Sequence, residues 1–127
     1  MFKLGQTYTR QEISHALGGS IQLYLPSSGG RVVCGCFKRD ARLNPGAPEV
    51  VTFGKGEYVE GNAELLAREA DPIIPVFLFQ ASGAWEYVGR YRCTGLSTDP
   101  AVLRREMQAN PQRGVIAGVL YFERVGD

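Results

Sequence analysis

Apolar and polar residues alternate along this chain with two periods, one typical of short helices and the other of strands. Residues 8–19 have the helical period, and their apolar stripe consists of Ile13, Ala16 and Leu17. Thr9 and Glu12 have the spacing of a capping box. The pattern therefore predicts a helix that begins after Thr9 and ends at Gly18–Gly19.

Two further helices are predicted later in the chain. Residues 61–71 read as a short helix capped by Asn62, with Leu65 and Leu66 facing inward. Residues 98–111 begin with Asp99 as a cap and a proline at the first helical position, which is where proline is tolerated.

The other apolar runs have the strand period. The predicted strands cover residues 20–25, 31–37, 49–53, 72–80, 84–93 and 114–125. In residues 84–93 one strand face is expected to carry Trp85, Tyr87, Gly89 and Tyr91.

Strands that arrive in pairs with hairpin-length turns predict an α+β protein. We expect a strongly curved, mainly antiparallel sheet or a small β-barrel, with about three short helices at its edges. The 127 residues contain no repeat or linker, so residues 1–127 are expected to form a single domain.

The charge balance excludes a polycation, because the net charge is only +1. Three cysteines and one histidine argue against a zinc site, and we expect no cofactor. No apolar run has the length of a membrane span, and the N-terminus lacks the apolar core of a signal peptide. These features predict a cytoplasmic protein with reduced, buried thiols.

Motifs for catalysis are missing from the sequence. His15, the one histidine, lies on the polar side of the first predicted helix, without an evident nucleophile beside it. The "GKG" at residues 54–56 is too short for a phosphate-binding loop.

Aromatic and basic residues are the remaining candidates for a site. Trp85 and Tyr87 are either core residues or a stacking wall, and Phe53 and Tyr58 flank the "GKG" turn as an opposing wall. Stacking of a base on an aromatic ring contributes about 1–3 kcal/mol.

Residues 36–49, "CFKRDARLNPGAPE", form a basic loop stiffened by two prolines. Either this loop is a solvated hairpin, or it contacts an anion.

Several of these pieces resemble one family when taken in order. The stretch "YTRQEISHALGGSIQLYLP" resembles the opening of the SRA-like, PUA-like readers of modified bases that occur in modification-dependent restriction systems. The matching positions are Tyr8, Arg10, Ile13, Gly18, Gly19 and Gln22. "GNAELL" and "WEYVGRY" resemble later parts of that family, and the whole order is similar to an uncharacterised family of small domains.

The resemblance implies a nucleic-acid-binding module that flips a modified base from duplex DNA into an aromatic-lined pocket. The implied base pocket contains Gln22, Phe53, Tyr58, Trp85 and Tyr87. The implied phosphate-binding residues are Arg10, Lys38, Arg39, Arg42 and Lys55. Modified duplex DNA is the expected partner, RNA is the alternative, and a nuclease or other effector protein is a further partner.

Two other functions remain open. A small enzyme of the same barrel class would act on a nucleotide or flipped base and would use Glu49 or Glu57 near the pocket rim. A protein-interaction domain would dock its basic loop on an acidic partner.

Overall fold

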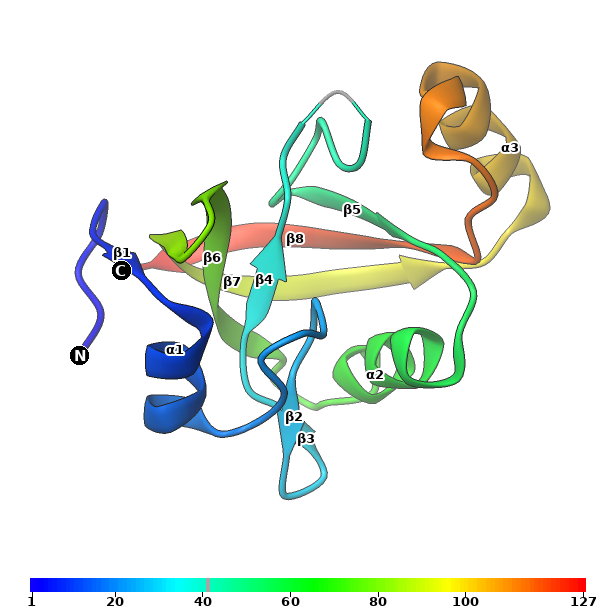
Figure 1. Cartoon of the computed structure of the whole chain (residues 1–127). Coiled ribbons are helices and arrows are strands. Elements are labelled where there is room, and N and C mark those ends of the chain that lie inside the picture. Colours follow the sequence, from blue (N-terminus) through cyan, green and yellow to red (C-terminus); the bar gives the residue numbers. More distant parts are fainter. Residues whose placement is uncertain (41) are drawn as a thin grey trace.

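A six-stranded mixed sheet is the framework of the chain (Figure 1). The computed structural model describes residues 1–40 and 42–127. The sheet order is β4 (Gly35–Phe37), β6 (Ile73–Ala81), β7 (Ala84–Ser97), β8 (Gly118–Gly126) and β5 (Val50–Phe53). A short strand, β1 (Thr7–Tyr8), also pairs with β7. The pairing of β4 with β6 is parallel, and the other pairings are antiparallel.

Three helices and one small hairpin surround the sheet. The helices are α1 (Arg10–Leu17), α2 (Glu57–Ala67) and α3 (Pro100–Ala109), and a 3₁₀ turn, η1 (Pro111–Arg113), follows α3. The hairpin consists of β2 (Ser27–Ser28) and β3 (Arg31–Val32). None of the helices in the described residues is long and apolar enough to cross a membrane.

The α+β class is confirmed, and the sheet is open. Its two edges are β4 and β5, which do not pair with each other, so the chain does not form the closed barrel that was the second predicted form. The sheet nevertheless curves strongly, because Phe37 of β4 packs on Phe122 of β8 at 5.6 Å between ring centroids although two strands lie between them in the sheet.

Two helices begin where the capping pattern predicts. At α1 the Glu12 N–H donates to Thr9 Oγ1 at 3.0 Å, and the Thr9 N–H donates to Glu12 Oε1 at 2.9 Å. At α3 the carboxylate of Asp99 accepts from the N–H of Ala101 at 2.8 Å. Local sequence alone fixes both starts, because each cap uses residues within three positions of the helix.

The predicted start of α2 at Asn62 is wrong, because the helix begins five residues earlier, at Glu57. Two acidic residues in its first turn, Glu57 and Glu60, favour this start through the helix dipole. Glu60 also accepts from the N–H of Gly56 at 2.9 Å. Asn62 therefore lies inside the helix, where it is buried.

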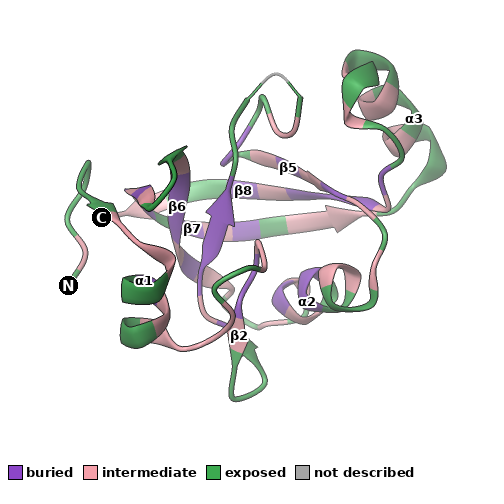
Figure 2. Ribbon diagram, in the orientation of Figure 1, coloured by how far each residue is buried: buried purple, intermediate pink, exposed green. Residues whose placement is uncertain are grey.

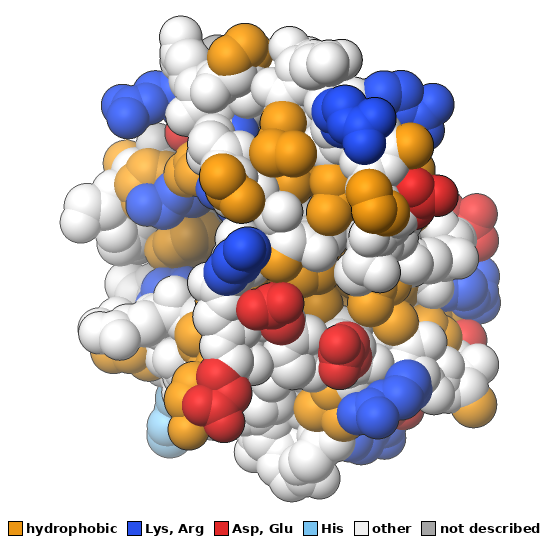
Figure 3. Space-filling model, turned by 90° about the vertical axis from the view of Figure 1, so that its right-hand side faces the viewer, with side chains coloured by type: hydrophobic (Ala, Val, Ile, Leu, Met, Phe, Trp, Pro, Cys, Tyr) orange, Lys and Arg blue, Asp and Glu red, His pale blue; other side chains and the backbone are white. Residues whose placement is uncertain are grey.

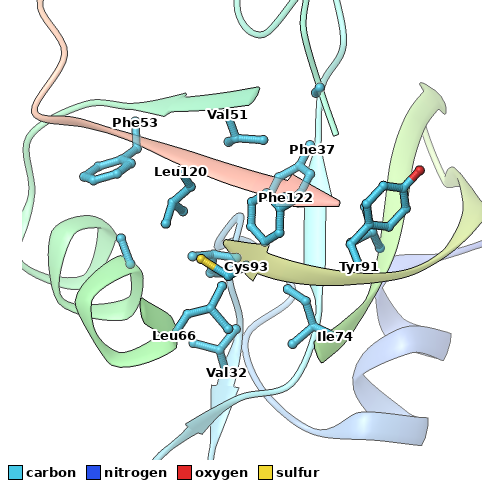
Figure 4. Close-up of a cluster of buried hydrophobic side chains, with 14 of the residues drawn as sticks. Val32, Phe37, Val51, Phe53, Leu66, Ile74, Tyr91, Cys93, Leu120 and Phe122 are labelled. Carbon is cyan, nitrogen blue, oxygen red and sulfur yellow. The ribbon is translucent and has the colours of Figure 1, made fainter. Parts of the chain in front are cut away.

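The side chains pack in two clusters, one on each face of the sheet. The larger cluster fills the concave side, under α2, and contains Phe37, Leu66, Leu120 and Phe122 among others (Figure 4). The smaller cluster lies under α1 and contains Ile13, Cys34, Cys36, Phe77, Trp85 and Tyr87. By contrast, α3 has no buried residue (Figure 2).

The alternation of burial predicted for β7 is confirmed, since Trp85, Tyr87, Gly89 and Tyr91 are all buried. The prediction that they share one face is wrong, because Trp85 and Tyr87 pack in the cluster under α1 and Tyr91 packs in the larger cluster. The pairing of β7 shifts register between Tyr87 and Gly89 and again between Arg90 and Tyr91. Three strand boundaries differ clearly from the prediction. The run 31–37 is divided between β3 and β4, β7 continues to Ser97, and the last strand begins at Gly118 rather than at Gly114.

The strand predicted over residues 20–25 is wrong. Its alternation is real, but its carbonyl groups accept hydrogen bonds from three different elements rather than from one neighbouring strand. Those of Ser20 and Leu23 accept from Nη2 of Arg10, at 3.0 and 2.7 Å. The hydroxyl of Ser20 also accepts from two N–H groups of the segment, which makes a local turn.

The rest of the segment is held by β4 and α2. The Tyr24 carbonyl accepts from the N–H of Cys36 at 2.8 Å, and the Pro26 carbonyl accepts from the N–H of Val33 at 2.9 Å. Between them, the carbonyl of Leu25 accepts from Nδ2 of Asn62 at 2.7 Å. Residues 20–26 thus cover the outer edge of β4 without forming a regular strand.

Asn62 gives the first prediction. Asn62→Leu removes the donor and leaves the buried carbonyl of Leu25 unpaired, which costs about 1–3 kcal/mol. We expect the free energy of unfolding in urea to fall by that amount. Glu64→Ala, on the exposed side of the same helix, is the control and should change it by less than about 0.5 kcal/mol. Equal effects of the two variants would contradict the role given to Asn62.

Arg10 gives the second prediction. Arg10→Lys retains the charge but loses the planar group that reaches two carbonyls and stacks on Trp85, so we expect about 1.5–3 kcal/mol less stability in urea. Arg105→Lys on the exposed side of α3 is the matched control. If Arg10 served only to contact phosphate, Arg10→Lys would leave the stability of the free protein unchanged.

Candidate functional site: a cavity between the two sheet edges

A cavity of about 540 Å³ lies where the two edges of the sheet approach each other. It is lined by residues 21–24, 36–38, 43–44 and 52–54, and by Arg10, Val59, Trp85 and Arg113. The lining therefore comes from both edge strands, from the 20–26 segment between them, and from the loop that follows β4. The cavity exists because the curved sheet stops short of closure.

Aromatic rings form one wall. Tyr24 lies between Phe37 of β4 and Phe53 of β5, at ring-centroid distances of 6.4 and 6.1 Å. Phe37 covers Gly35 and Phe53 covers Gly118, and a side chain at either glycine would collide with the ring. These two close contacts hold the rings against the sheet, so the wall is fixed before any ligand arrives.

The Tyr24 hydroxyl is also fixed, because it donates to the carbonyl of Val59 in α2 at 2.7 Å. Burial, and then the nearby carboxylate of Glu60, raises the pKa of Tyr24 far above its ordinary value. The phenol therefore stays protonated and acts as a neutral part of the wall.

A polar network forms the opposite wall. Oδ1 of Asn44 accepts from the N–H of Thr52 at 2.7 Å and from Oγ1 of Thr52 at 2.9 Å. Oγ1 of Thr52 in turn accepts from Nε of Arg113 at 3.1 Å, and the Thr52 carbonyl accepts from Nη2 of Arg113 at 3.5 Å. Arg113 thereby connects the end of η1 to β5 and brings a positive charge to the cavity.

The charges in the lining are of one sign. Arg10, Lys38 and Arg113 are cationic, and within the described part of the chain no Asp or Glu lines the cavity. Nζ of Lys38 lies 4.8 Å from the centre of the Phe79 ring, which supports the ammonium on an aromatic face at the cavity mouth. Such a site favours an anionic or acceptor-rich ligand.

Cys36 contributes a thiol to the lining, and its Sγ lies 4.0 Å from Sγ of Cys34. The hydrogen bond between the thiols, followed by burial, raises the pKa of Cys34. The same bond lowers the pKa of Cys36, although burial opposes it. Among the described residues, no group of three His, Cys, Asp or Glu side chains could hold a metal ion.

Three of the five predicted base-pocket residues come together here. Gln22, Phe53 and Trp85 line the cavity. Trp85 is also a core residue, with only 8% of its surface exposed, and its ring packs between Arg10 at 5.1 Å and Phe79 at 5.2 Å. Tyr87 lies in the cluster under α1, and Tyr58 is 69% exposed on α2, so neither lines the cavity.

The predicted phosphate-binding residues are more dispersed. Arg10 and Lys38 line the cavity, but the guanidinium of Arg10 is engaged with two carbonyls and the Trp85 ring. Arg39, Arg42 and Lys55 are exposed and lie outside the lining.

The loop after β4 is held by Asp40. Its Oδ1 accepts from the N–H groups of Arg42 and Leu43 at 2.8 and 2.7 Å. The bonds from Leu43 and Arg42 hold the pKa of the Asp40 carboxyl below its ordinary value. Ala41 of the basic loop lies outside the described residues.

Among the lining residues that were not predicted from the sequence, those of the aromatic and polar walls include Tyr24, Asn44, Thr52 and Arg113. Tyr24 shares the polar face of the 20–25 alternation with Gln22, and this signal could have identified it. Arg113 follows a helix, 61 positions from the threonine that it contacts, so no local pattern could have placed it in the cavity.

The face that carries α3 and α2 is shown in Figure 3. Hydrophobic side chains gather in its upper half next to Lys and Arg side chains. Acidic side chains lie at its upper right edge and across its middle and lower half, where Lys and Arg side chains also occur, so this surface carries both signs of charge.

Comparisons with known proteins agree on the fold. The whole chain is similar to a solved structure described as the sulfur binding domain and SRA domain of ScoMcrA complexed with phosphorothioated DNA, with a TM-score of 0.56 and 13% identity. The chain spans only 41% of the length of that protein chain, and at this identity the likeness shows the fold alone.

The comparison with curated proteins finds no match. A family model does match, over residues 7–113, which includes both sheet edges and all of the cavity lining. The chain therefore belongs to the family described as a domain of unknown function, DUF6697.

Proposed function

We propose that this chain is a nucleic-acid-binding module that reads a modified base, flipped from duplex DNA into the cavity between β4 and β5. The observation that carries the proposal is the lining itself, in which fixed aromatic rings face three cations and no carboxylate of the described residues.

The size and walls of the cavity suit a base. Its volume of about 540 Å³ falls within the range of about 300–1,000 Å³ that is common for small-molecule sites. A base is planar and apolar on its faces, so it gains from contact with Tyr24, Phe53 or Trp85. Gln22, exposed at the rim, has both a donor and an acceptor for the edge of the base.

The distribution of charge supports a nucleic acid as the ligand. Arg39 and Arg42 on the exposed loop would contact phosphates beside an extruded nucleotide, and Lys38 adds a positive charge in the cavity lining. The network of Asp40 holds this loop in place before binding, which lowers the entropy cost of forming those contacts.

The similar solved structure contains phosphorothioated DNA, which favours DNA over RNA as the partner. In this proposal the module delivers its modified site to a nuclease or another effector protein.

An enzyme of the same fold is the second candidate, and the geometry favours it less. Glu49 and Glu57, the carboxylates that such an enzyme would use, are exposed and outside the cavity lining. A domain that docks its basic loop on an acidic protein is the third candidate, and it gives no role to the aromatic cavity.

Fluorescence anisotropy with matched duplexes separates these functions. The duplexes carry plain cytosine, 5-methylcytosine, 5-hydroxymethylcytosine, 5-hydroxymethyluracil or N6-methyladenine at one position. Preference of at least tenfold for one modified duplex, equivalent to about 1.4 kcal/mol, supports the reader. Equal binding of all duplexes, or release of a product from one of them, contradicts it.

The basic loop gives a third prediction. Changing Arg39 and Arg42 together to Ala should weaken binding to plain and modified duplexes alike, because phosphate contacts carry no base information. The slope of log K against log salt should become shallower by about 1.8, at about 0.9 per phosphate contact. Replacing Arg104 and Arg105 of α3 together is the control, and an unchanged slope in the loop variant would contradict the assignment.

Asp40 gives a fourth prediction, in which two variants separate the effect of its charge from the effect of loop order. Asp40→Asn retains the acceptor for the loop N–H groups and removes a negative charge, so affinity for DNA should rise. Asp40→Ala removes the same charge but also frees the loop, so its affinity should fall below that of Asp40→Asn. Equal affinities of the two variants at low salt would show that loop order does not contribute.

A further inference from the structure

We propose that the cavity prefers a keto base, which carries a carbonyl oxygen at the ring position where cytosine and adenine carry an amino group. This inference rests on the proposed function, since it names the class of base that the same cavity reads. It follows from a count of the donors and acceptors that the wall has left to offer.

Four backbone acceptors of the lining are already engaged. The carbonyl of Leu23 accepts from Arg10, and that of Tyr24 accepts from the N–H of Cys36. On β5 the carbonyl of Thr52 accepts from Arg113, and that of Phe53 accepts from the N–H of Ala117 at 2.8 Å. An incoming amino group would have to compete with each of these bonds.

The side-chain acceptors of the polar wall are engaged as well. A backbone N–H can only donate, so the bond from Thr52 N–H fixes the Asn44 amide with its oxygen toward Thr52. That oxygen receives the Thr52 hydroxyl as a second donor. The hydroxyl oxygen, in turn, accepts from Arg113.

What remains on this wall are donors. The two N–H groups on Nδ2 of Asn44 are left over once its oxygen is engaged. The ammonium of Lys38 and Nη1 of Arg113 make no hydrogen bond or ion pair with any of the described residues. The wall therefore presents donors from three side chains, two of them cationic.

This inventory distinguishes the two kinds of base. Carbonyl oxygens of a uracil-, thymine- or hypoxanthine-type base accept from such donors, and these bases carry no amino group. The amino group of cytosine or adenine adds two N–H groups that find no free acceptor on this wall, and an unpaired buried donor lowers affinity. The ring N–H of a keto pyrimidine is a single donor, which the amide oxygen of Gln22 at the rim can accept.

The test compares bases that differ in this one group. One pair of duplexes carries 5-hydroxymethyluracil or 5-hydroxymethylcytosine, and a second pair carries 8-oxohypoxanthine or 8-oxoadenine. Each base is placed opposite an abasic site, so that extrusion breaks no base pair, and the unmodified bases serve as references. In at least one pair, we expect the duplex with the keto base to bind at least tenfold more tightly than the duplex with the amino base. The pair that shows this preference tells whether the cavity reads a pyrimidine or a purine.

Asn44→Asp supplies the matching change in the protein. The carboxylate retains the acceptor for Thr52 and replaces the free N–H groups by a second acceptor. The ratio of keto to amino affinity should fall at least tenfold. Asn110→Asp adds the same charge close to the loop but outside the cavity lining, so it should leave the ratio unchanged.

Lys38→Gln provides a second test of the same affinity ratio. Lys38 is exposed, so this variant does not depend on the stability of the Asn44 network. It removes the ammonium, adds an acceptor, and should also lower the ratio.

The outcomes separate this inference from the function on which it rests. Preference for modified over plain bases, with equal or tighter binding of the amino members, overturns the inference and leaves the reader intact. Equal binding of modified and plain bases in every pair overturns the reader and, with it, the inference. If Asn44→Asp and Lys38→Gln both leave the keto preference unchanged, the donors of Asn44 and Lys38 are not its cause, and the inference is overturned.

Discussion

The segment of residues 20–26 is the constraint on which the rest of the structure depends. Four consecutive carbonyls, from Leu23 to Pro26, are held by Arg10 of α1, by Asn62 of α2 and by two N–H groups at or just before β4. Because this segment occupies the outer edge of β4, no further strand can pair there. The sheet stays open, and its two edges leave a cavity between them.

The same arrangement gives the cavity its chemistry. The bonds that hold the 20–26 segment consume carbonyl acceptors, and the Asn44–Thr52–Arg113 network consumes those on β5. The groups left over are aromatic faces and cationic or amide donors. A net charge of +1 is therefore compatible with a strongly one-signed site, because the carboxylates lie elsewhere on the surface.

Local signals predicted much of this fold, and long-range polar contacts account for what they missed. Capping residues located α1 and α3, and the alternation of β7 located its buried residues, because each depends on neighbours in sequence. Asn62 was wrongly predicted to be a helix cap and residues 20–25 were wrongly predicted to be a strand. Asn62 instead donates a hydrogen bond to the carbonyl of Leu25, which lies 37 positions away in the chain. In the candidate site, Gln22, Phe53 and Trp85 were found from local patterns and the resemblance, whereas Thr52 and Arg113 enter the site through contacts 61 positions apart in the chain.

The emission of Trp85, the one tryptophan of the chain, tests the central claim most directly, because its ring lines the cavity. The protein is titrated to saturation with a plain duplex and with the modified duplex that it prefers, and binding is followed in parallel by anisotropy. A base that enters the cavity should quench Trp85 with the modified duplex and much less with the plain one. If the protein saturates with both duplexes and Trp85 has the same emission in both complexes, no base enters the cavity. That result would contradict a base-reading cavity and would indicate that the protein binds DNA through its basic loop alone.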